Sequence, residues 1–264
     1  MNDAPPLNKQ SPIPLYYQLA EELGDKIRNG TLPPGARLPG ERELSEQFGI
    51  SRMTVRQALA YLTRQGAIVA HQGQGTFVSE PKLAHDTLHL LSFTEEMLRQ
   101  GQAPTSRVIE QSRLPAPKAV ARQLSLLVGD AVTKIVRLRY SVGAPLLLET
   151  VYVPQSLAPG LELTDLSQAS LYQVLEERYA LRLNQAQQSL EAITANEAEA
   201  GLFGIAAGTA MLMLQGVTFA HSGQPAEYFK AIYRGDRFMF QLESRRDLGS
   251  SESVTAPRMS VVMR

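Results

Sequence analysis

The sequence contains no cysteine and no tryptophan among its 264 residues. Without cysteine the chain can form no disulfide, no thiolate metal site and no cysteine nucleophile. No apolar run approaches the roughly 18–20 residues that a membrane-spanning helix needs, and the opening residues MNDAPPLNKQSP lack the basic-then-apolar pattern of a secretory signal. The sequence therefore predicts a soluble, cytoplasmic protein with no membrane partner.

The sequence also lacks an excess of either charge, because 26 lysines and arginines balance 26 aspartates and glutamates. A neutral chain is not expected to bind nucleic acid through bulk charge alone, although one of its faces can still be basic. At roughly 100–200 residues per domain, a length of 264 residues indicates two domains. A hydrophobic content of 44% is enough for each to bury a core.

Residues 1–79 carry the pattern of three short helices followed by a β-hairpin. Apolar side chains recur every third or fourth residue in each helical stretch, and Ser51 is suited to cap the third helix. Gly73 and Gly75 separate two short β-prone runs, as in a hairpin turn. This order predicts a winged helix-turn-helix domain. The expected helices lie at about 15–27, 41–48 and 51–65, and the expected strands at 67–70 and 76–79.

Beyond residue 79 the pattern becomes rich in strands. Residues 80–91 have weak signals for secondary structure and are expected to form a linker and hinge. Residues 92–243 alternate strands with short helices, which predicts an α+β domain around a mostly antiparallel sheet. Residues 244–264 are polar and are expected to form a flexible tail. The expected strands are 108–114, 131–141, 146–153, 183–193, 211–220 and 227–233, with helices at about 94–100, 117–124, 170–179 and 196–203.

The first turn of the third helix is the part of a helix-turn-helix that contacts DNA. Arg52 and Arg56 are one turn apart on one face, and a guanidinium can bind O6 and N7 of guanine. Ser51 and Thr54 carry hydroxyls suited to phosphate oxygens at a helix N-terminus. The hairpin residues expected to approach the sugar-phosphate edge are Gly73, Gly75 and Thr76.

Two arginines one turn apart are also what an ordinary solvated helix face carries, and the distribution of charge favours DNA binding over that alternative. Residues 47–79 contain three arginines and no acidic residue, whereas most acidic residues of this half lie before residue 47. Such segregation predicts a basic surface within a neutral chain.

Three blocks of the N-terminal half resemble the signature of GntR-type bacterial transcription regulators in order and spacing: 38–44 (LPGEREL), 49–59 (GISRMTVRQAL) and 73–78 (GQGTFV). Gly40 departs from the signature by replacing the serine that usually caps the second helix. Met53 stands where a small hydroxyl residue is common, so an apolar contact with a thymine methyl is expected there. The resemblance places Arg42, Ser51, Arg52, Thr54, Arg56 and Gly73 at DNA-contacting positions.

The second half carries no pattern of a metal centre or of a familiar catalytic site. It has histidines at 85, 89 and 221 but no His-x-x-x-His pair. Neither a Gly-x-Ser-x-Gly elbow nor a phosphate-binding glycine loop is present. We therefore expect no metal, no cofactor and no catalytic residue.

Polar residues of the second half indicate instead a site for a small anion. Arg137 and Arg139 project from one face of a strand, and on an internal face they must be paired or must hold an anion. Ser92 and Thr94 precede a short helix whose N-terminal amides favour the same anion. Glu149 lies in a strongly apolar strand, where it pairs with an arginine or binds ligand hydroxyls. Spacing alone leaves a solvated sheet face and a purely structural ion pair open.

Short blocks between residues 88 and 243 resemble, in order, the UTRA effector domain of the HutC subfamily, whose fold is similar to chorismate lyase. By this resemblance the domain binds a small acid, such as a phosphorylated sugar or an amino-acid catabolite like urocanate. The resemblance places Ser92, Phe93, Thr94, Arg137, Arg139 and Ser170 at anion-holding positions, and Glu149, Tyr172, Glu227 and Tyr233 around the rest of the pocket.

Both halves together predict a ligand-responsive transcription factor, usually a repressor in this family. We expect it to bind a near-palindromic operator in double-stranded DNA as a homodimer, since two-fold protein symmetry matches two half-sites. Two other functions stay open at this point. One is a chorismate-lyase-like enzyme fused to a DNA-binding head, and the other is an architectural or non-specific DNA-binding protein.

Overall fold

The computed structural model describes residues 7–71, 73–80, 82–86 and 89–241. The chain divides into two compact units, Met1–Lys82 and Leu83–Arg264. Among the described helices, none is long and apolar enough to cross a membrane. The tail predicted at 244–264 lies outside the described residues.

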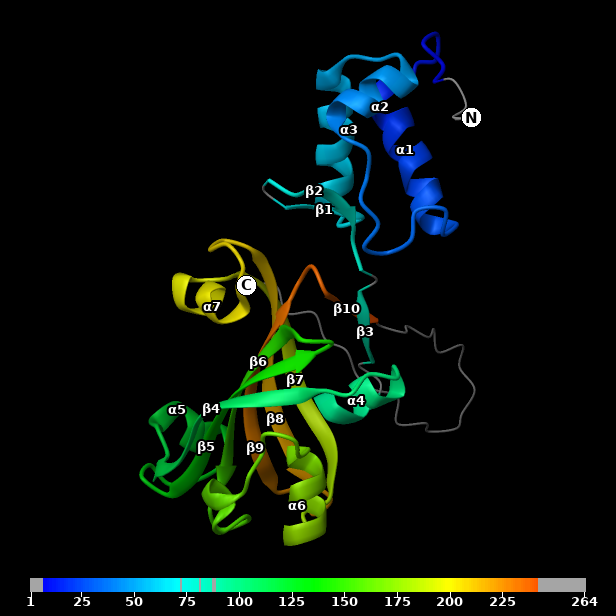
Figure 1. The fold of residues 1–264 in the computed structure, drawn as a ribbon. Helices are drawn as coiled ribbons and strands as arrows, with labels where there is room; N and C mark the ends of the chain where they lie inside the picture. Colours follow the sequence, from blue (N-terminus) through cyan, green and yellow to red (C-terminus); the bar gives the residue numbers. More distant parts are fainter. Residues whose placement is uncertain (1–6, 72, 81, 87–88, 242–264) are drawn as a thin grey trace, which may run out of the picture. The chain divides into compact units, whose positions relative to one another are not determined.

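The first unit consists of three helices followed by a two-stranded hairpin (Figure 1). Each helix buries the apolar side chains that recur along one face, and Leu19, Leu44 and Val55 are at most 1% exposed. Gly49 ends the second helix in the left-handed conformation, and Ser51 caps the third. The predicted winged helix-turn-helix is confirmed. Its elements are α1 (Leu15–Arg28), α2 (Glu41–Phe48), α3 (Arg52–Arg64), β1 (Ile68–His71) and β2 (Gly75–Val78).

The connection between α1 and α2 adds a third segment to the hairpin. The backbone N–H of Leu38 donates to the carbonyl of Thr76 at 2.8 Å, and that of Val78 donates to the carbonyl of Ala36 at 2.8 Å. Arg37 lies between these two contacts. Strand β2 therefore pairs on one side with β1 and on the other with residues far upstream in the chain.

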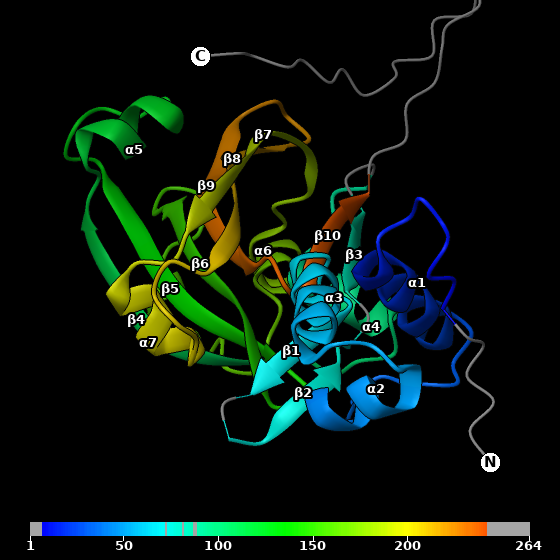
Figure 2. The same cartoon turned by 90° about the horizontal axis from the view of Figure 1, so that it is seen from above.

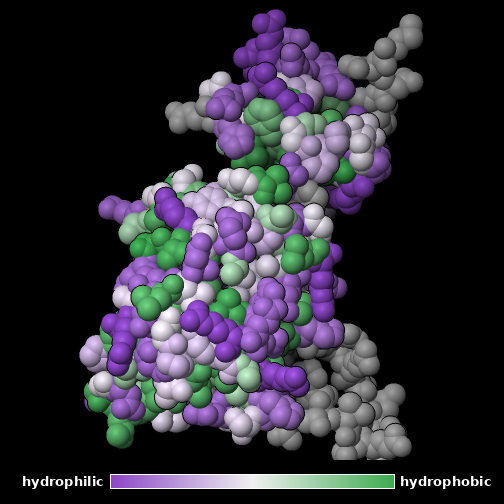
Figure 3. Space-filling view, turned by 60° about the horizontal axis from the view of Figure 1, so that its bottom comes forward, coloured by the Kyte–Doolittle hydropathy of each residue, from purple (hydrophilic) through white to green (hydrophobic). Residues whose placement is uncertain are grey.

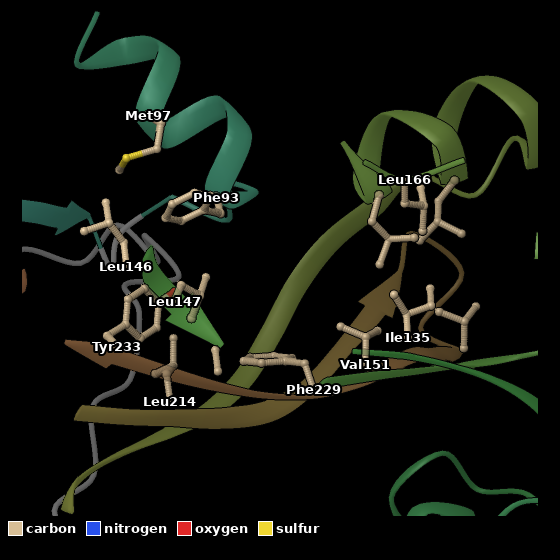
Figure 4. Close-up of a cluster of buried hydrophobic side chains, with 14 of the residues drawn as sticks. Phe93, Met97, Ile135, Leu146, Leu147, Val151, Leu166, Leu214, Phe229 and Tyr233 are labelled. Carbon is tan, nitrogen blue, oxygen red and sulfur yellow. The ribbon is translucent and has the colours of Figure 1, made fainter. Parts of the chain in front are cut away.

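The second unit is built on a six-stranded antiparallel sheet in the order β4-β5-β6-β9-β8-β7. Helices α4 and α6 cover one side, where Figure 4 shows Phe93 and Met97 next to the sheet residues Leu147 and Tyr233. Figure 2 shows α5 and α7 on the other side. The predicted α+β class is confirmed. The elements are α4 (Phe93–Arg99), β4 (Thr105–Pro115), α5 (Lys118–Gln123), β5 (Ala131–Ser141), β6 (Ala144–Pro154), a 3-10 turn η1 (Leu161–Leu163), α6 (Leu171–Tyr179), β7 (Leu183–Thr194), α7 (Glu197–Phe203), β8 (Ala210–Ala220) and β9 (Pro225–Arg234).

A separate parallel pair joins the start of the second unit to its last described strand. Strand β3 (Leu83–Asp86) lies within the segment expected to be a linker and pairs with β10 (Phe238–Gln241). Phe238 is 1% exposed and its ring lies 4.9 Å from that of Tyr233 and 6.4 Å from that of Phe93. Strand β10 is therefore anchored in the same core as α4.

Candidate functional site

The N-terminus of α3 presents polar side chains to solvent. Ser51 accepts a hydrogen bond from the N–H of Thr54 at 3.1 Å, and the two hydroxyls are 2.9 Å apart. Ser51, Arg52 and Arg56 are exposed, and the Met53 side chain is 61% exposed although it is apolar. The first turns of α3 thus expose to solvent the hydroxyl, guanidinium and apolar groups that the sequence analysis expected to contact DNA.

Arg56 is held by an acidic residue of the neighbouring helix. Its Nε and Nη2 atoms donate to the two carboxylate oxygens of Glu41 at 3.0 and 2.9 Å. The hydrogen bond from Arg56 lowers the pKa of the Glu41 carboxyl. Arg42 similarly pairs with Glu46 at 2.8 Å. The charge segregation seen along the sequence is therefore smaller on the surface, because the acids of α2 lie close to α3 in space although they are distant in sequence.

The hairpin adds one basic residue that the sequence did not reveal. Arg37 is exposed, and its guanidinium lies so close to Gly75 that an added Cβ there would be 2.9 Å from Arg37 Nε. Gly73 and Gly75 both have positive φ, at 75° and 121°, conformations that favour glycine. Arg37 was missed because its position depends on the pairing of residues 36–38 with β2, which no local pattern indicates.

Ionisable side chains of the second unit gather on the sheet face that α4 and α6 cover. Arg137 and Arg139 of β5 are 1% and 3% exposed, and Glu227 of β9 is 3% exposed. Glu149 of β6 pairs in register with Arg137. The alternative of a solvated sheet face is therefore wrong for both arginines. We call these four residues the polar cluster.

Glu149 is the counter-ion of both arginines. Arg137 Nε and Nη2 donate to Glu149 Oε2 at 3.0 and 2.6 Å, and Arg139 Nη1 lies 3.5 Å from the same oxygen. Arg139 Nη2 also donates to Thr94 Oγ1 at 2.8 Å, and its guanidinium lies 4.9 Å from the Phe93 ring centre. Arg139 Nε is buried and has no hydrogen-bond partner in the described part of the chain. One guanidinium is thus only partly satisfied.

Two serine hydroxyls meet beside the arginines. Ser92 caps α4 and Ser170 caps α6, and Ser170 Oγ donates to Ser92 Oγ at 3.2 Å. The carbonyl of Ala169, next to Ser170, accepts from Arg137 Nη1 at 3.4 Å. The first residues of both helices therefore converge on the guanidiniums.

The two carboxyl groups of the polar cluster have pKa values shifted in opposite directions. Burial, reinforced by the charge of Glu149, raises the pKa of Glu227 to about 8. Burial opposes ionisation of Glu149 as well, but the two guanidiniums outweigh it and lower its pKa. Burial and the charge of Arg137 lower the pKa of Arg139 to about 10, so this arginine stays protonated near pH 7. Within the polar cluster two guanidiniums therefore share the ionised carboxylate of Glu149, and α4, which covers this face, carries a further buried carboxyl, that of Glu96.

The raised pKa of Glu227 makes stability depend on pH. Between the ordinary value of 4.5 and about 8, the folded protein keeps a proton that the unfolded chain has released. The stabilisation is complete below pH 4.5 and is lost as pH rises toward 8. Glu227→Gln cannot ionise, so its unfolding free energy relative to wild type is expected to rise by roughly 1.4 kcal/mol per pH unit across this window.

Urea denaturation of the second unit at pH 5.5, 7.0 and 8.5 measures this difference. Glu110→Gln is the matched control, because the hydrogen bond from Lys134 lowers the pKa of that carboxyl, and no growing advantage is expected for it. A difference between Glu227→Gln and wild type that stays constant with pH would contradict the assignment of a neutral Glu227.

Two family models match the chain. The model of bacterial regulatory proteins of the gntR family matches residues 15–78, and the UTRA domain model matches residues 99–239. The HTH-type transcriptional repressor NagR of Bacillus subtilis is 40% identical over 234 residues, covering 89% of this chain and 96% of the relative. The chain belongs to the gntR family.

Other relatives agree with this membership. The histidine utilization repressor of Pseudomonas putida is 30% identical over 236 residues, covering 89% of this chain and 93% of the relative. The crystal structure of PhnF from Mycobacterium smegmatis has a TM-score of 0.62 at 31% identity and covers 86% of this chain and 99% of that one. This protein is therefore a transcriptional repressor of the GntR/UTRA type with DNA-binding and effector-binding roles. Its function is regulatory, and the chorismate-lyase-like enzyme considered above is not supported.

In this repressor the structure brings the predicted effector residues together on one sheet face and the helices that cover it. Two further residues join them that the sequence did not single out. Thr218 of β8 is fully buried with its hydroxyl 3.3 Å from that of Tyr172, and Phe238 packs against Tyr233. Neither carried a signal beyond ordinary strand patterning. Among the described residues, no group of histidines and acids could hold a metal ion.

Proposed function

We propose that this repressor binds a near-palindromic operator as a homodimer and that a small anion, bound at the polar cluster, changes its affinity for the operator. The observation that carries the anion is that two buried guanidiniums, those of Arg137 and Arg139, share a single carboxylate oxygen, Glu149 Oε2. An uncompensated buried cation is strongly unfavourable. An anion placed against Arg139, whose Nε has no partner in the described residues, would offset that charge.

The groups around the arginines suit an acid that also carries hydroxyls. Ser92, Thr94 and Ser170 offer hydroxyl donors to phosphate or carboxylate oxygens. Neutral Glu227, whose Oε2 is buried without a partner in the described residues, can bind a hydroxyl. One relative is named for a mannosyl-D-glycerate system and another for fructoselysine utilization. We propose an acidic or phosphorylated sugar derivative as the class of effector.

For operator binding we propose the surface formed by α3 and the hairpin. Arg52 and Arg56 would read base edges in the major groove, and Ser51 and Thr54 would bind phosphates. The DNA backbone would be contacted by Arg42, Gly73, Gly75 and Thr76. Arg37, which lies beside Gly75, would join them. Footprinting distinguishes this proposal from an architectural DNA-binding protein. A repressor should protect a specific operator, whereas an architectural protein would protect DNA without preference for any sequence.

We propose that residues 1–79 act as the DNA-binding head, residues 92–243 as the effector domain, and residues 80–91 as the hinge. Strand β3 supports this position for the hinge, because it follows the first unit directly and pairs with a strand of four residues only. A two-stranded pair outside a larger sheet is marginally stable.

Thermal unfolding of the full-length protein with candidate anions tests effector binding. The panel is glucose 6-phosphate, mannosylglycerate, urocanate and inorganic phosphate, with glucose as the neutral control. A ligand at 100 times its dissociation constant stabilises the folded state by about 2.7 kcal/mol, and we expect this from at least one anion and not from glucose. Thr94→Val removes one hydroxyl donor without changing side-chain size and should weaken that effect. Equal stabilisation by glucose would contradict an anion site.

A further inference from the structure

Thr218 of β8 is a fully buried polar residue next to Glu227 of the polar cluster. Hydrophobic and hydrophilic residues are mixed on the face drawn in Figure 3, whereas Thr218 places a polar group in the interior with 0% exposure. Its hydroxyl lies 3.3 Å from the hydroxyl of Tyr172 on α6. A buried hydroxyl is unfavourable unless it is hydrogen-bonded. The contact with Tyr172 is therefore what a threonine supplies here and a valine of nearly the same size would not.

Thr218, Tyr172 and Glu227 meet from three different elements. Thr218 and Glu227 face each other in register across β8 and β9. Burial raises the pKa of Glu227, and the Tyr172 hydroxyl partly opposes that rise, so the two side chains lie within reach of each other. Burial, followed by the charge of Glu227, raises the pKa of Tyr172 well above its ordinary value. Both groups are therefore protonated near pH 7, and we call the three residues the neutral trio.

The neutral trio lies farther along the sheet than the two arginines. Glu149, which binds both guanidiniums, pairs in register with Ala231 of β9, four residues beyond Glu227. Four residues of a strand span about 13 Å. Phe229 lies between them on the same sheet face, because alternate residues of a strand point to one side. Inorganic phosphate held at the arginines is too small to contact the trio as well, whereas a phosphorylated sugar extends toward it.

We infer that Thr218 is a positioning residue for effector selectivity: its hydroxyl holds that of Tyr172 beside Glu227, so that the trio binds an uncharged hydroxyl of the effector. Without Thr218, the Tyr172 hydroxyl is free to turn to Glu227 Oε2, which has no partner among the described residues, and a ligand would have to break that contact. Sites that hydrogen-bond a ligand hydroxyl discriminate against analogues that lack it. The inference rests on the proposed effector site and assigns the part of it that distinguishes effectors with the same anionic group.

Calorimetric titration of the full-length protein with glucose 6-phosphate and with inorganic phosphate tests this role. Wild type should bind glucose 6-phosphate more tightly. Thr218→Val should weaken that binding roughly 5- to 20-fold, the loss of about one hydrogen bond, and leave phosphate binding unchanged. Thr218→Ser keeps the hydroxyl and should keep the preference. Thr133→Val is the matched control, because Thr133 is also 0% exposed and its hydroxyl accepts from Gln155 Nε2 at 2.6 Å, away from the trio.

The ratio of the two dissociation constants separates positioning from a merely structural role. A ratio that falls in Thr218→Val but not in Thr218→Ser or Thr133→Val supports the inference, and Tyr172→Phe should lower it as well, since it removes the same contact from the other side. An unchanged ratio in Thr218→Val, or an equal fall in Thr133→Val, overturns it. A wild type that binds phosphate as tightly as glucose 6-phosphate overturns the inference and leaves the anion site standing. A wild type that binds neither overturns the phosphorylated sugar as effector and the inference with it.

Discussion

Replacing Arg137 alone by methionine is expected to destabilise the effector domain by about 3–5 kcal/mol. The side chain is 1% exposed and supplies two hydrogen bonds, of 2.6 and 3.0 Å, to Glu149 Oε2. Without it, Glu149, whose side chain is 17% exposed, keeps only the 3.5 Å contact from Arg139. The cost comes from a buried carboxylate that has lost its main partner. This cost is therefore larger than the net contribution of the ion pair to the free energy of unfolding.

A double-mutant cycle in urea denaturation separates these quantities. Arg137→Met and Glu149→Met should each be strongly destabilising, whereas the double variant should recover only part of the loss, because the Arg137–Glu149 pair is removed together but buried Arg139 still loses its carboxylate partner. Lys134→Met is the matched control, since Lys134 and Glu110 form a pair of similar length, 2.6 Å, with side chains 25% and 41% exposed. We expect it to cost less than about 1 kcal/mol. A similar small cost for Arg137→Met would contradict the buried pair.

Replacing Arg52 by alanine is expected to weaken operator binding by about 1–3 kcal/mol, or roughly 5- to 150-fold. Arg52 is exposed at the start of α3 and forms no ion pair with a described residue, so its loss should leave the fold intact. Arg56→Ala should cost at least as much, because it also leaves the Glu41 carboxylate facing the DNA without its partner.

Arg64→Ala is the control for both, since Arg64 lies in the last turn of the same helix with its guanidinium over the Tyr61 ring. Binding is measured by fluorescence anisotropy at one fixed salt concentration, because protein–DNA affinities depend strongly on salt. Arg64→Ala should bind operator as wild type does. Wild-type affinity of Arg52→Ala would show that α3 does not read the operator.

The elements with strong local patterns were predictable from the sequence. Helix α2 was expected at 41–48 and β5 at 131–141, and both have these bounds. Their signals are local: a helix ended by glycine, and a β-branched run with alternating polarity. Strands β3 and β10 were not predicted, because each has four residues and forms only by pairing with the other, more than 150 positions away. Short strands of this kind depend on tertiary contacts that residue patterns do not contain.

The polar cluster was predictable in composition but not in its pairing. Alternation placed Arg137 and Arg139 on one strand face, and the structure adds that one oxygen of Glu149 serves both. The pair of Arg56 with Glu41 was not foreseen, because it links residues 15 positions apart through the packing of α2 on α3. Charge segregation along a sequence therefore overestimates charge segregation on the surface.

The affinity of full-length protein for its operator, with and without a saturating anion that stabilises the protein, tests the central claim most directly. Allosteric coupling is typically 1–3 kcal/mol, so the account predicts a change of roughly tenfold in the dissociation constant, absent with glucose and reduced in Thr94→Val. An anion that stabilises the protein and leaves operator affinity unchanged would contradict regulation through the polar cluster.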